Sequence, residues 1–322
     1  MKYNQLGGTG LSVSQIGFGC GNVGGLMIRG NRKEREHAVS CAIDLGINYF
    51  DTAPSYGNGL SEINLGQALR DLKKEPYIGT KFRIGLSDIK DIKKSIISSI
   101  EQSLKRLGRE HIQLIQLHNR IAVKQDVVQD ILSVQDILID VRESFNILKR
   151  QGKVSFWGIT ALGDTGAVHK VIESCKMHSI QTVYNLLNQT AGGGTTQKLE
   201  DQDFKNLIDK AALRKIGVIV IRPLAGGALT GSNIRHPVAS PAPMPMGSSL
   251  NYSDDVERTK KLGFLEHEGH LENLIEAAIR LPVGNIGVST ILVGFSSISQ
   301  IKQSVDYALK GRLPFHLIKR LE

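Results

Sequence analysis

The feature that most constrains the fold of this chain is a repeated alternation of short β-rich runs with amphipathic segments. A stretch with apolar residues at helical spacing follows the β-rich runs, and several of these stretches end at a glycine. Eight strands alternating with helices predict an α/β fold whose parallel strands close into a (β/α)8 TIM barrel. An open doubly wound sheet could use the same elements, but the count of eight favours the barrel. The eight runs are residues 14–19, 47–53, 77–82, 112–118, 154–160, 182–187, 217–223 and 289–295.

Two segments lie outside this repeat. Residues 2–15 predict a small N-terminal β-hairpin that turns at Gly7 and Gly8 and closes the bottom of the barrel. Residues 232–255, rich in Pro, Ser and Met, predict a long irregular loop after strand seven. This loop is interpreted either as a disordered connector or as a flap over the barrel mouth. No shift in composition marks a boundary, so we expect a single domain over residues 1–322.

Charge and cysteine content narrow the classes of partner. Lys and Arg outnumber Asp and Glu by 40 to 31, but the basic residues are scattered along amphipathic segments such as residues 87–108. This pattern favours a solvated surface with a mild attraction for anions over a nucleic-acid-binding face. The three cysteines are widely spaced without a CxxC pair, and no apolar run reaches about 18 residues. We therefore expect a cytoplasmic protein with neither disulfide nor metal, which binds neither nucleic acid nor membrane.

A glycine-rich loop follows the first β-rich run. Gly19 to Gly24 match the G-x-G-x-x-G pattern of Rossmann dinucleotide-binding domains. In that fold a helix opens on the last glycine and directs its first amides at the pyrophosphate. Here no helical periodicity is present before about Lys33. A Rossmann domain is therefore the disfavoured alternative.

Four residues with acid–base chemistry occur at or near the ends of three consecutive predicted strands. Asp51 ends the second, Lys81 lies in "IGTKF" of the third, and His118 ends the fourth; Tyr56 lies on the loop after Asp51. Each alone has an ordinary structural interpretation, such as a turn cap or a half-buried histidine. In a barrel, however, the carboxyl ends of the strands face one shared mouth. Together the four residues predict a site for proton transfer.

The expected chemistry follows from the charges of these groups. An ammonium at Lys81, held by the Asp51 carboxylate, stabilises a neighbouring phenolate and so lets Tyr56 exchange a proton. Tyr56 is then a general acid toward a carbonyl oxygen, or a base in the reverse direction. His118 can hydrogen-bond the same oxygen. This set implies no metal and no covalent nucleophile, but it lacks a source of electrons.

The stretches that carry these residues resemble the signatures of a known family. "FDTAPSYGNGLSE", "IGTKF" and "LIQLHNR" are similar to three stretches of the aldo-keto reductases, which are (β/α)8 barrels that use a nicotinamide cofactor. The resemblance implies that Asp51, Tyr56, Lys81 and His118 form the family's catalytic tetrad. It also implies hydride transfer between NADP(H) or NAD(H) and an aldehyde, ketone or aldose. The stretch "GITALGDT" resembles members that oxidise aldose sugars.

The same resemblance implies which residues bind the ligands. The first loop would pass close to the cofactor, the ends of strands five and six would hold the carboxamide, the loop after strand seven would wrap the pyrophosphate, and the last helix would begin under the adenosine phosphate. The implied cofactor-binding residues are Gly19, Cys20, Asp51, Thr160, Gln181, Arg222, Pro223, Leu224, Gly226, Gly294, Phe295, Ser296, Ser297 and Gln300. Small-molecule substrate would meet Tyr56 and His118, with Val23, Asn119 and Tyr184 as further candidates.

Several positions depart from the family pattern. Thr160 stands where many relatives have Ser, and Ile221 takes the place of an aromatic that stacks on the nicotinamide. Gln300 and Ser304 replace an Arg and an Asn on the adenosine side, which removes a bidentate partner for a 2′-phosphate. The choice between NADP(H) and NAD(H) therefore stays open, as do substrate, reaction direction and oligomeric state. The alternative to an enzyme is a cofactor-binding regulatory subunit of the same fold, like the potassium-channel β subunits.

Overall fold

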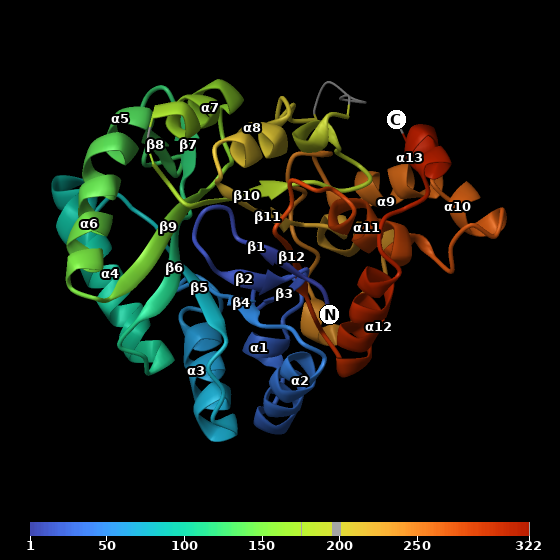
Figure 1. The fold of residues 1–322 in the computed structure, drawn as a ribbon, viewed down its shortest axis with the longest axis horizontal. Helices are drawn as coiled ribbons and strands as arrows, with labels where there is room; N and C mark the ends of the chain where they lie inside the picture. The colour runs from blue at the N-terminus through green and yellow to red at the C-terminus, as the bar shows by residue number, and fades with distance from the viewer. Residues whose placement is uncertain (175, 195–200, 322) are drawn as a thin grey trace.

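A closed barrel of parallel strands forms the centre of the protein (Figure 1). The computed structural model describes residues 1–174, 176–194 and 201–321. Within these ranges eight strands form the barrel, and the last pairs with the first, so the predicted (β/α)8 fold is confirmed. The strands are β3 (Ile16–Gly19), β4 (Tyr49–Asp51), β5 (Tyr77–Phe82), β6 (Ile112–Leu117), β9 (Val154–Thr160), β10 (Ser179–Val183), β11 (Gly217–Ile221) and β12 (Thr290–Gly294).

Amphipathic helices surround the barrel and bury their apolar faces against its outer surface. Local signals set several of their ends: Asn31 and Glu34 form a capping box before α2, and Gly108 ends α4 in the left-handed conformation. The main helices are α2 (Arg32–Asp44), α3 (Leu60–Leu72), α4 (Ile92–Leu107), α6 (Arg142–Arg150), α7 (Thr165–Ser174), α8 (Leu207–Leu213), α11 (Leu274–Val283) and α12 (Ile298–Leu309). Shorter helices are α1 (Leu26–Arg29), α5 (Val134–Asp136), α9 (Tyr252–Lys260), α10 (Phe264–His267) and α13 (Phe315–Leu321). None of the described helices is long and apolar enough to cross a membrane.

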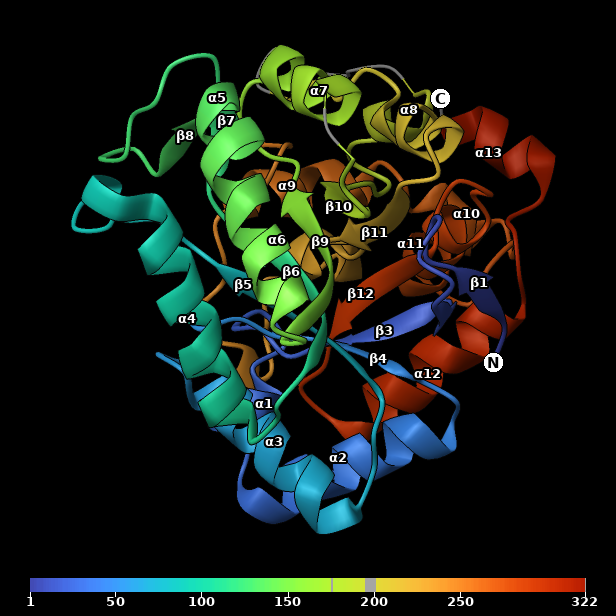
Figure 2. The same cartoon turned by 60° about the vertical axis from the view of Figure 1, so that its left-hand side comes forward.

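The N-terminal hairpin closes one end of the barrel, as predicted. Its strands β1 (Tyr3–Gln5) and β2 (Ser12–Ser14) pair antiparallel. The Asn4 side chain donates hydrogen bonds to the carbonyl oxygens that precede β12. Leu6 enters the barrel from the turn and packs in an apolar cluster with Val13, Tyr49, Leu114, Ile219 and Leu292. Figure 2 shows this hairpin and the β7–β8 pair at opposite ends of the barrel.

Three local predictions were wrong. The sixth strand was expected at residues 182–187 but spans Ser179–Val183, because polar Ser179 and Gln181 lie within it and interrupt the apolar run. Leu186 and Leu187 pack into the core beyond the strand. A short helix, α1, occurs where no helix was expected before Lys33. Two short paired strands, β7 (Arg120–Ala122) and β8 (Ile131–Ser133), were not predicted and lie after β6.

Candidate functional site

The centre of the barrel mouth holds a buried ion pair between Asp51 and Lys81. Both side chains point into the barrel, where Asp51 is 3% and Lys81 is 1% exposed. The Lys81 ammonium bonds Asp51 Oδ1 and donates to the Thr52 carbonyl at 3.0 Å. Gln181 Nε2 donates to the other carboxylate oxygen of Asp51 at 2.7 Å. The pair is therefore held on both sides by hydrogen bonds, as buried charges require.

Burial and mutual attraction act on the two charges in different directions. Burial by itself disfavours the ammonium of Lys81, but the attraction of Asp51 and the nearby Tyr56 raise its pKa above the ordinary value. Burial raises the pKa of the Asp51 carboxyl, while Lys81 and Gln181 oppose this shift. Lys81 is thus a firmly protonated cation at neutral pH.

Tyr56 and His118 complete the predicted group of four. Lys81 Nζ lies 4.7 Å from the centroid of the Tyr56 ring, and the His118 ring stands edge-on to the same ring at 6.0 Å. Burial, together with the charges of Lys81 and Arg83, lowers the pKa of His118 to about 3. The imidazole is therefore neutral at pH 7. One of its ring nitrogens can donate a hydrogen bond, and the other can accept one. The tertiary structure brings all four predicted residues together.

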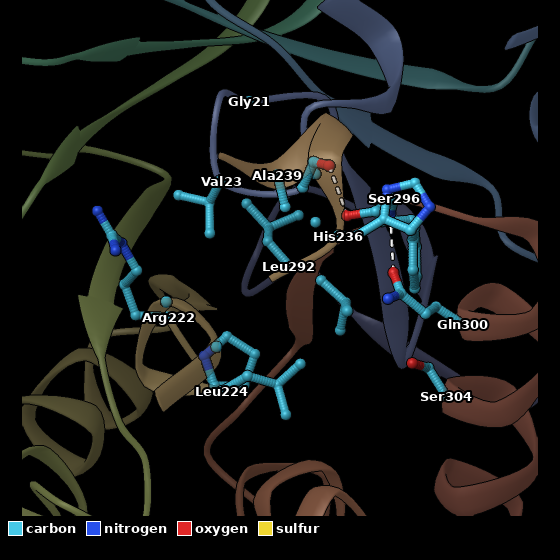
Figure 3. A pocket seen from close by; sticks show the side chains of 18 of the residues that line it. Gly21, Val23, Arg222, Leu224, His236, Ala239, Leu292, Ser296, Gln300 and Ser304 are labelled. Carbon is cyan, nitrogen blue, oxygen red and sulfur yellow. Dashed lines mark hydrogen bonds between the residues drawn. The ribbon is translucent and has the colours of Figure 1, made fainter. Parts of the chain in front are cut away.

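A cavity of about 250 Å³ opens beside Asp51 and Tyr56 (Figure 3). It extends from Asp51 and Tyr56 along the ends of β11 and β12 to the start of α12. Many of the residues predicted to bind the cofactor line it, together with Val23, a predicted substrate contact. These are Gly19, Arg222, Pro223, Leu224, Gly226, Gly294, Phe295, Ser296 and Gln300.

The first glycine-rich loop has a structural explanation. A Cβ on Gly24 would lie 2.2 Å from the backbone nitrogen of Phe295, so only glycine allows this loop to pack against the end of β12. Gly24 also accepts a hydrogen bond from Ser296 Oγ at 2.7 Å. The closed barrel excludes the Rossmann alternative, since the G-x-G-x-x-G match lies in a βα loop of the barrel.

The start of α12 is occupied by its own side chains. Ser297 is the N-cap residue, and its hydroxyl accepts a hydrogen bond from the backbone N–H of Gln300 at 3.5 Å. Gln300 Oε1 in turn accepts a hydrogen bond from the Ser296 amide at 2.8 Å. A phosphate at this helix end would compete with Gln300 for the Ser296 amide.

The long segment after β11 covers the cavity rather than trailing away from it. Arg235, His236 and Ala239 line the cavity, although the sequence had singled out none of them. The Arg235 guanidinium donates to the Gly226 carbonyl at 2.7 Å and to the Val23 carbonyl at 3.3 Å. Of the two interpretations of residues 232–255, the flap over the mouth describes this arrangement. The available signal was the presence of basic residues in a Pro- and Ser-rich loop.

Seven of the residues predicted to contact a ligand do not line this cavity: Cys20, His118, Asn119, Thr160, Gln181, Tyr184 and Ser297. Asn119 is fully buried; its amide nitrogen donates to the Ile84 carbonyl and to Asp130, and its oxygen accepts from the Ile84 amide. Tyr184 is buried in the core. Cys20 is also buried, and burial raises its thiol pKa. The side chains of Asn119, Tyr184 and Cys20 take part in packing or loop support, and a contact of these residues with a ligand stays a prediction.

One buried polar atom fits a ligand that carries a hydrogen-bonding group. Thr160 Oγ1, at the end of β9, is buried without a hydrogen-bond partner in the described chain. Buried hydroxyls are normally satisfied, so this orphan atom is consistent with the carboxamide contact implied for Thr160. Among the described residues, no group of three or more His, Cys, Asp or Glu side chains is arranged to hold a metal ion.

Comparisons with known proteins agree with this geometry. Residues 15–322 match the aldo/keto reductase family. The chain is 27% identical to an L-galactose dehydrogenase of Arabidopsis thaliana over 310 residues, which cover 95% of this chain and 87% of that protein. It is 29% identical over 326 residues to a putative voltage-gated potassium channel subunit beta of Schizosaccharomyces pombe, with the same coverage.

Among solved structures, the holo form of an aldo-keto reductase from Bacillus halodurans superposes with a TM-score of 0.74 at 24% identity. That match covers 100% of this chain and 95% of the other, and it supports the fold. The family match, together with the barrel and the four residues at its mouth, shows that this chain belongs to the aldo/keto reductase family of oxidoreductases.

Proposed function

We propose that the protein is an NAD(P)-dependent oxidoreductase that interconverts a carbonyl group and an alcohol in an aldehyde, ketone or aldose, with Tyr56 as general acid and base. The observation that carries this proposal is the position of the Lys81 ammonium, 4.7 Å from the centre of the Tyr56 ring and fixed by a buried carboxylate. A cation so placed stabilises the phenolate that remains after Tyr56 gives up its proton.

Each residue of the group has a separate task in this reaction. Tyr56 delivers a proton to the carbonyl oxygen during reduction and takes it back during oxidation. Lys81 stabilises the phenolate, while Asp51 and Gln181 hold Lys81 in place. Neutral His118, beside Tyr56, donates a hydrogen bond to the same oxygen and so orients the carbonyl. Bound nicotinamide would supply or accept the hydride.

The residues around the cavity suit a dinucleotide in an extended pose. Thr160 would hold the carboxamide, and the main chain from Arg222 to Gly226 would surround the diphosphate. Gly226 suits this role because its φ of 71° lies in the left-handed region that favours glycine, and the absence of a side chain lets a ligand approach the main chain. The start of α12 would receive the adenosine end.

The adenosine end bears on the choice between NADP(H) and NAD(H). Gln300 Oε1 already accepts the Ser296 amide, and no arginine stands at position 300 to pair with a 2′-phosphate. His236 lies near Ser296 and Gln300 at this end of the cavity (Figure 3). Parallel equilibrium titrations with NADH and NADPH decide the preference. Tighter NADH binding would make aldose oxidation the first activity to screen, whereas tighter NADPH binding would favour carbonyl reduction.

Replacement of Tyr56 tests the catalytic assignment. We expect Tyr56→Phe to lower kcat by about 10²- to 10⁴-fold and to leave cofactor affinity unchanged, because only the proton donor is lost. Tyr3→Phe is the matched control, since Tyr3 also loses a hydroxyl but lies in the hairpin at the far end of the barrel. Full turnover by Tyr56→Phe would refute the proposal.

The similarity to a protein named as a potassium channel subunit keeps one alternative in view. In that case the chain would bind the cofactor and act through a partner protein. A screen of wild-type protein against aldehydes, ketones and aldoses, with bound cofactor verified by titration, separates the two. Cofactor binding without turnover of any carbonyl compound would favour the regulatory subunit.

A further inference from the structure

Two arginines face the cavity, and their guanidinium groups are in different states. Arg235 is saturated by neutral oxygens: the carbonyls of Val23, Gly226 and Ala239 and the hydroxyl of Tyr252. Arg222 has no hydrogen-bonding or ion-pair partner for its guanidinium within the described chain, although the residue is only partly exposed. The hydrogen bonds of Arg235 hold its loop in place. A partly buried guanidinium without a partner, such as that of Arg222, is suited to bind an anion.

The backbone holds Arg222 in an unusual conformation. Its φ of 56° lies in the left-handed region, which a non-glycine residue adopts at a cost in energy. Two hydrogen bonds to its carbonyl fix this conformation, from the Ala225 amide at 2.9 Å and from Asn185 Nδ2 at 2.9 Å. Strained residues that the surroundings hold in place occur preferentially at ligand sites.

Arg222 directly follows β11 and lines the cavity. Figure 3 shows its side chain on the side of Val23, with Gln300 and Ser304 on the opposite side. Burial lowers the pKa of Arg222, and interaction with Tyr56 opposes this shift. Asp255, a carboxylate whose charge acts on it, is itself buried and accepts hydrogen bonds from the Ser248 hydroxyl and the Ser249 backbone amide. The guanidinium lies close to Gly226 in the cavity that Tyr56 also lines, and no carboxylate of the described chain is paired to it.

We propose that Arg222 is a specificity-determining residue that binds an anionic group, a carboxylate or a phosphate, on the substrate. This inference rests on the proposed function and narrows its substrate class to anionic aldehydes, ketones or sugars. A guanidinium in the same cavity as the proton donor would hold such a substrate by its charge while Tyr56 and His118 interact with its carbonyl group.

The cofactor diphosphate is the other source of the same chemistry, and one experiment distinguishes the two. The probes are pairs of aldehydes that differ in charge: 4-oxobutanoate against butanal, and glyceraldehyde 3-phosphate against glyceraldehyde. The value of kcat/KM for each probe and the Kd for NADH and NADPH are measured for wild type, Arg222→Met and Arg222→Lys. Methionine keeps an unbranched apolar side chain in place of the aliphatic part of arginine and removes the guanidinium. Arg150→Gln is the matched control, since it removes one exposed positive charge at the end of α6.

We expect Arg222→Met to lower kcat/KM for a charged aldehyde by about ten- to one-hundred-fold, the loss of one charge-assisted hydrogen bond. The charged-to-neutral ratio of kcat/KM should fall by the same factor, and Arg222→Lys should restore part of the charged activity. An equal loss for charged and neutral aldehydes, with weaker cofactor binding, would assign Arg222 to the diphosphate and overturn the proposal. Unchanged kinetics for every probe would overturn it as well.

A binding measurement keeps this test separate from the proposed function. Calorimetric titration of the protein with succinate, in the presence of saturating oxidised cofactor, should show binding to wild type and about tenfold weaker binding to Arg222→Met. If wild type turns over no aldehyde, the proposed function fails, while the succinate titration still decides whether Arg222 binds an anion. If Arg222→Met does not fold, Arg222→Lys is compared with wild type instead. The measured quantity is then the ratio of kcat/KM for the charged aldehyde to kcat/KM for its neutral partner. An unchanged ratio in Arg222→Lys would then count against the proposal, because a bidentate anion site distinguishes the two cations.

Discussion

The two ends of the barrel interior are built from the same strands but have opposite chemistry. At the hairpin end the strands direct Tyr49, Leu114 and Ile219 inward, and Leu6 closes this apolar layer. Two residues further along, the same faces of β4, β6 and β11 bear Asp51, Gln116 and Ile221. Burial of apolar side chains therefore stabilises the hairpin end. The mouth instead contains buried charges and buried polar atoms without hydrogen-bond partners, which cost stability.

This difference teaches how a barrel separates stability from function. The polar end is costly to the fold, because Asp51 and Lys81 are almost completely removed from water. Orphan polar atoms at Gln116 and Thr160 add to that cost. The apolar end has no part in the proposed chemistry and is free to be packed as a hydrophobic core. Substitutions at the two ends should consequently affect different measured quantities.

The largest effect is expected when one partner of the buried Asp51–Lys81 ion pair is removed. Lys81→Met leaves the Asp51 carboxylate buried without its cation, and we expect a loss of about 3–5 kcal/mol in the free energy of unfolding. Turnover should disappear together with the support of the Tyr56 phenolate. Urea unfolding and kcat measure the two losses on the same sample.

The double variant Asp51→Asn/Lys81→Met sharpens this result. Removal of both charges eliminates the uncompensated carboxylate, so much of the lost stability should return while activity stays absent. If the double variant were as unstable as the single one, packing rather than charge would explain the loss.

At the apolar end, Leu6→Ala should affect stability alone. Leu6 is fully buried in the cluster that closes the barrel, and its truncation should cost about 2–5 kcal/mol through lost burial and a residual cavity. The value of kcat per folded molecule should remain that of wild type. A selective fall in kcat at full folding would show that the two ends are coupled and would contradict the separation drawn above.

The last effect is absent at neutral pH and appears only in acid, in the pH dependence of stability. The pKa of His118 lies near 3 in the fold, below its ordinary value of 6.5, so the unfolded chain binds one more proton between these pH values. The His118 contribution is complete above about pH 6.5 and is lost as the pH falls toward 3, with a slope of at most about 1.4 kcal/mol per pH unit. Urea unfolding of wild type and His118→Gln from pH 4 to 7 isolates this contribution. Parallel curves for the two proteins would mean that His118 is not held neutral by its surroundings.

Much of the fold and the catalytic group could be predicted because the signals are local. Short β-rich runs and glycine-terminated helical stretches indicate where strands and helices occur. In a barrel, the end of a strand already determines which mouth a residue faces, so Asp51, Lys81 and His118 could be grouped without coordinates. The sixth strand was misplaced because polar Ser179 and Gln181 lie inside the barrel and hide the apolar pattern.

The sequence by itself determined the alternation of elements, the barrel and the identity of four residues at its mouth. Only the tertiary structure decided that residues 235–239 cover the cavity and that Asn119 supports a loop. It also decided that Arg222 is unpaired while Arg235 is saturated. The physical reason is that a side chain's hydrogen-bond partners come from segments distant in sequence, and local patterns of hydrophobicity carry no information about which of these segments meet.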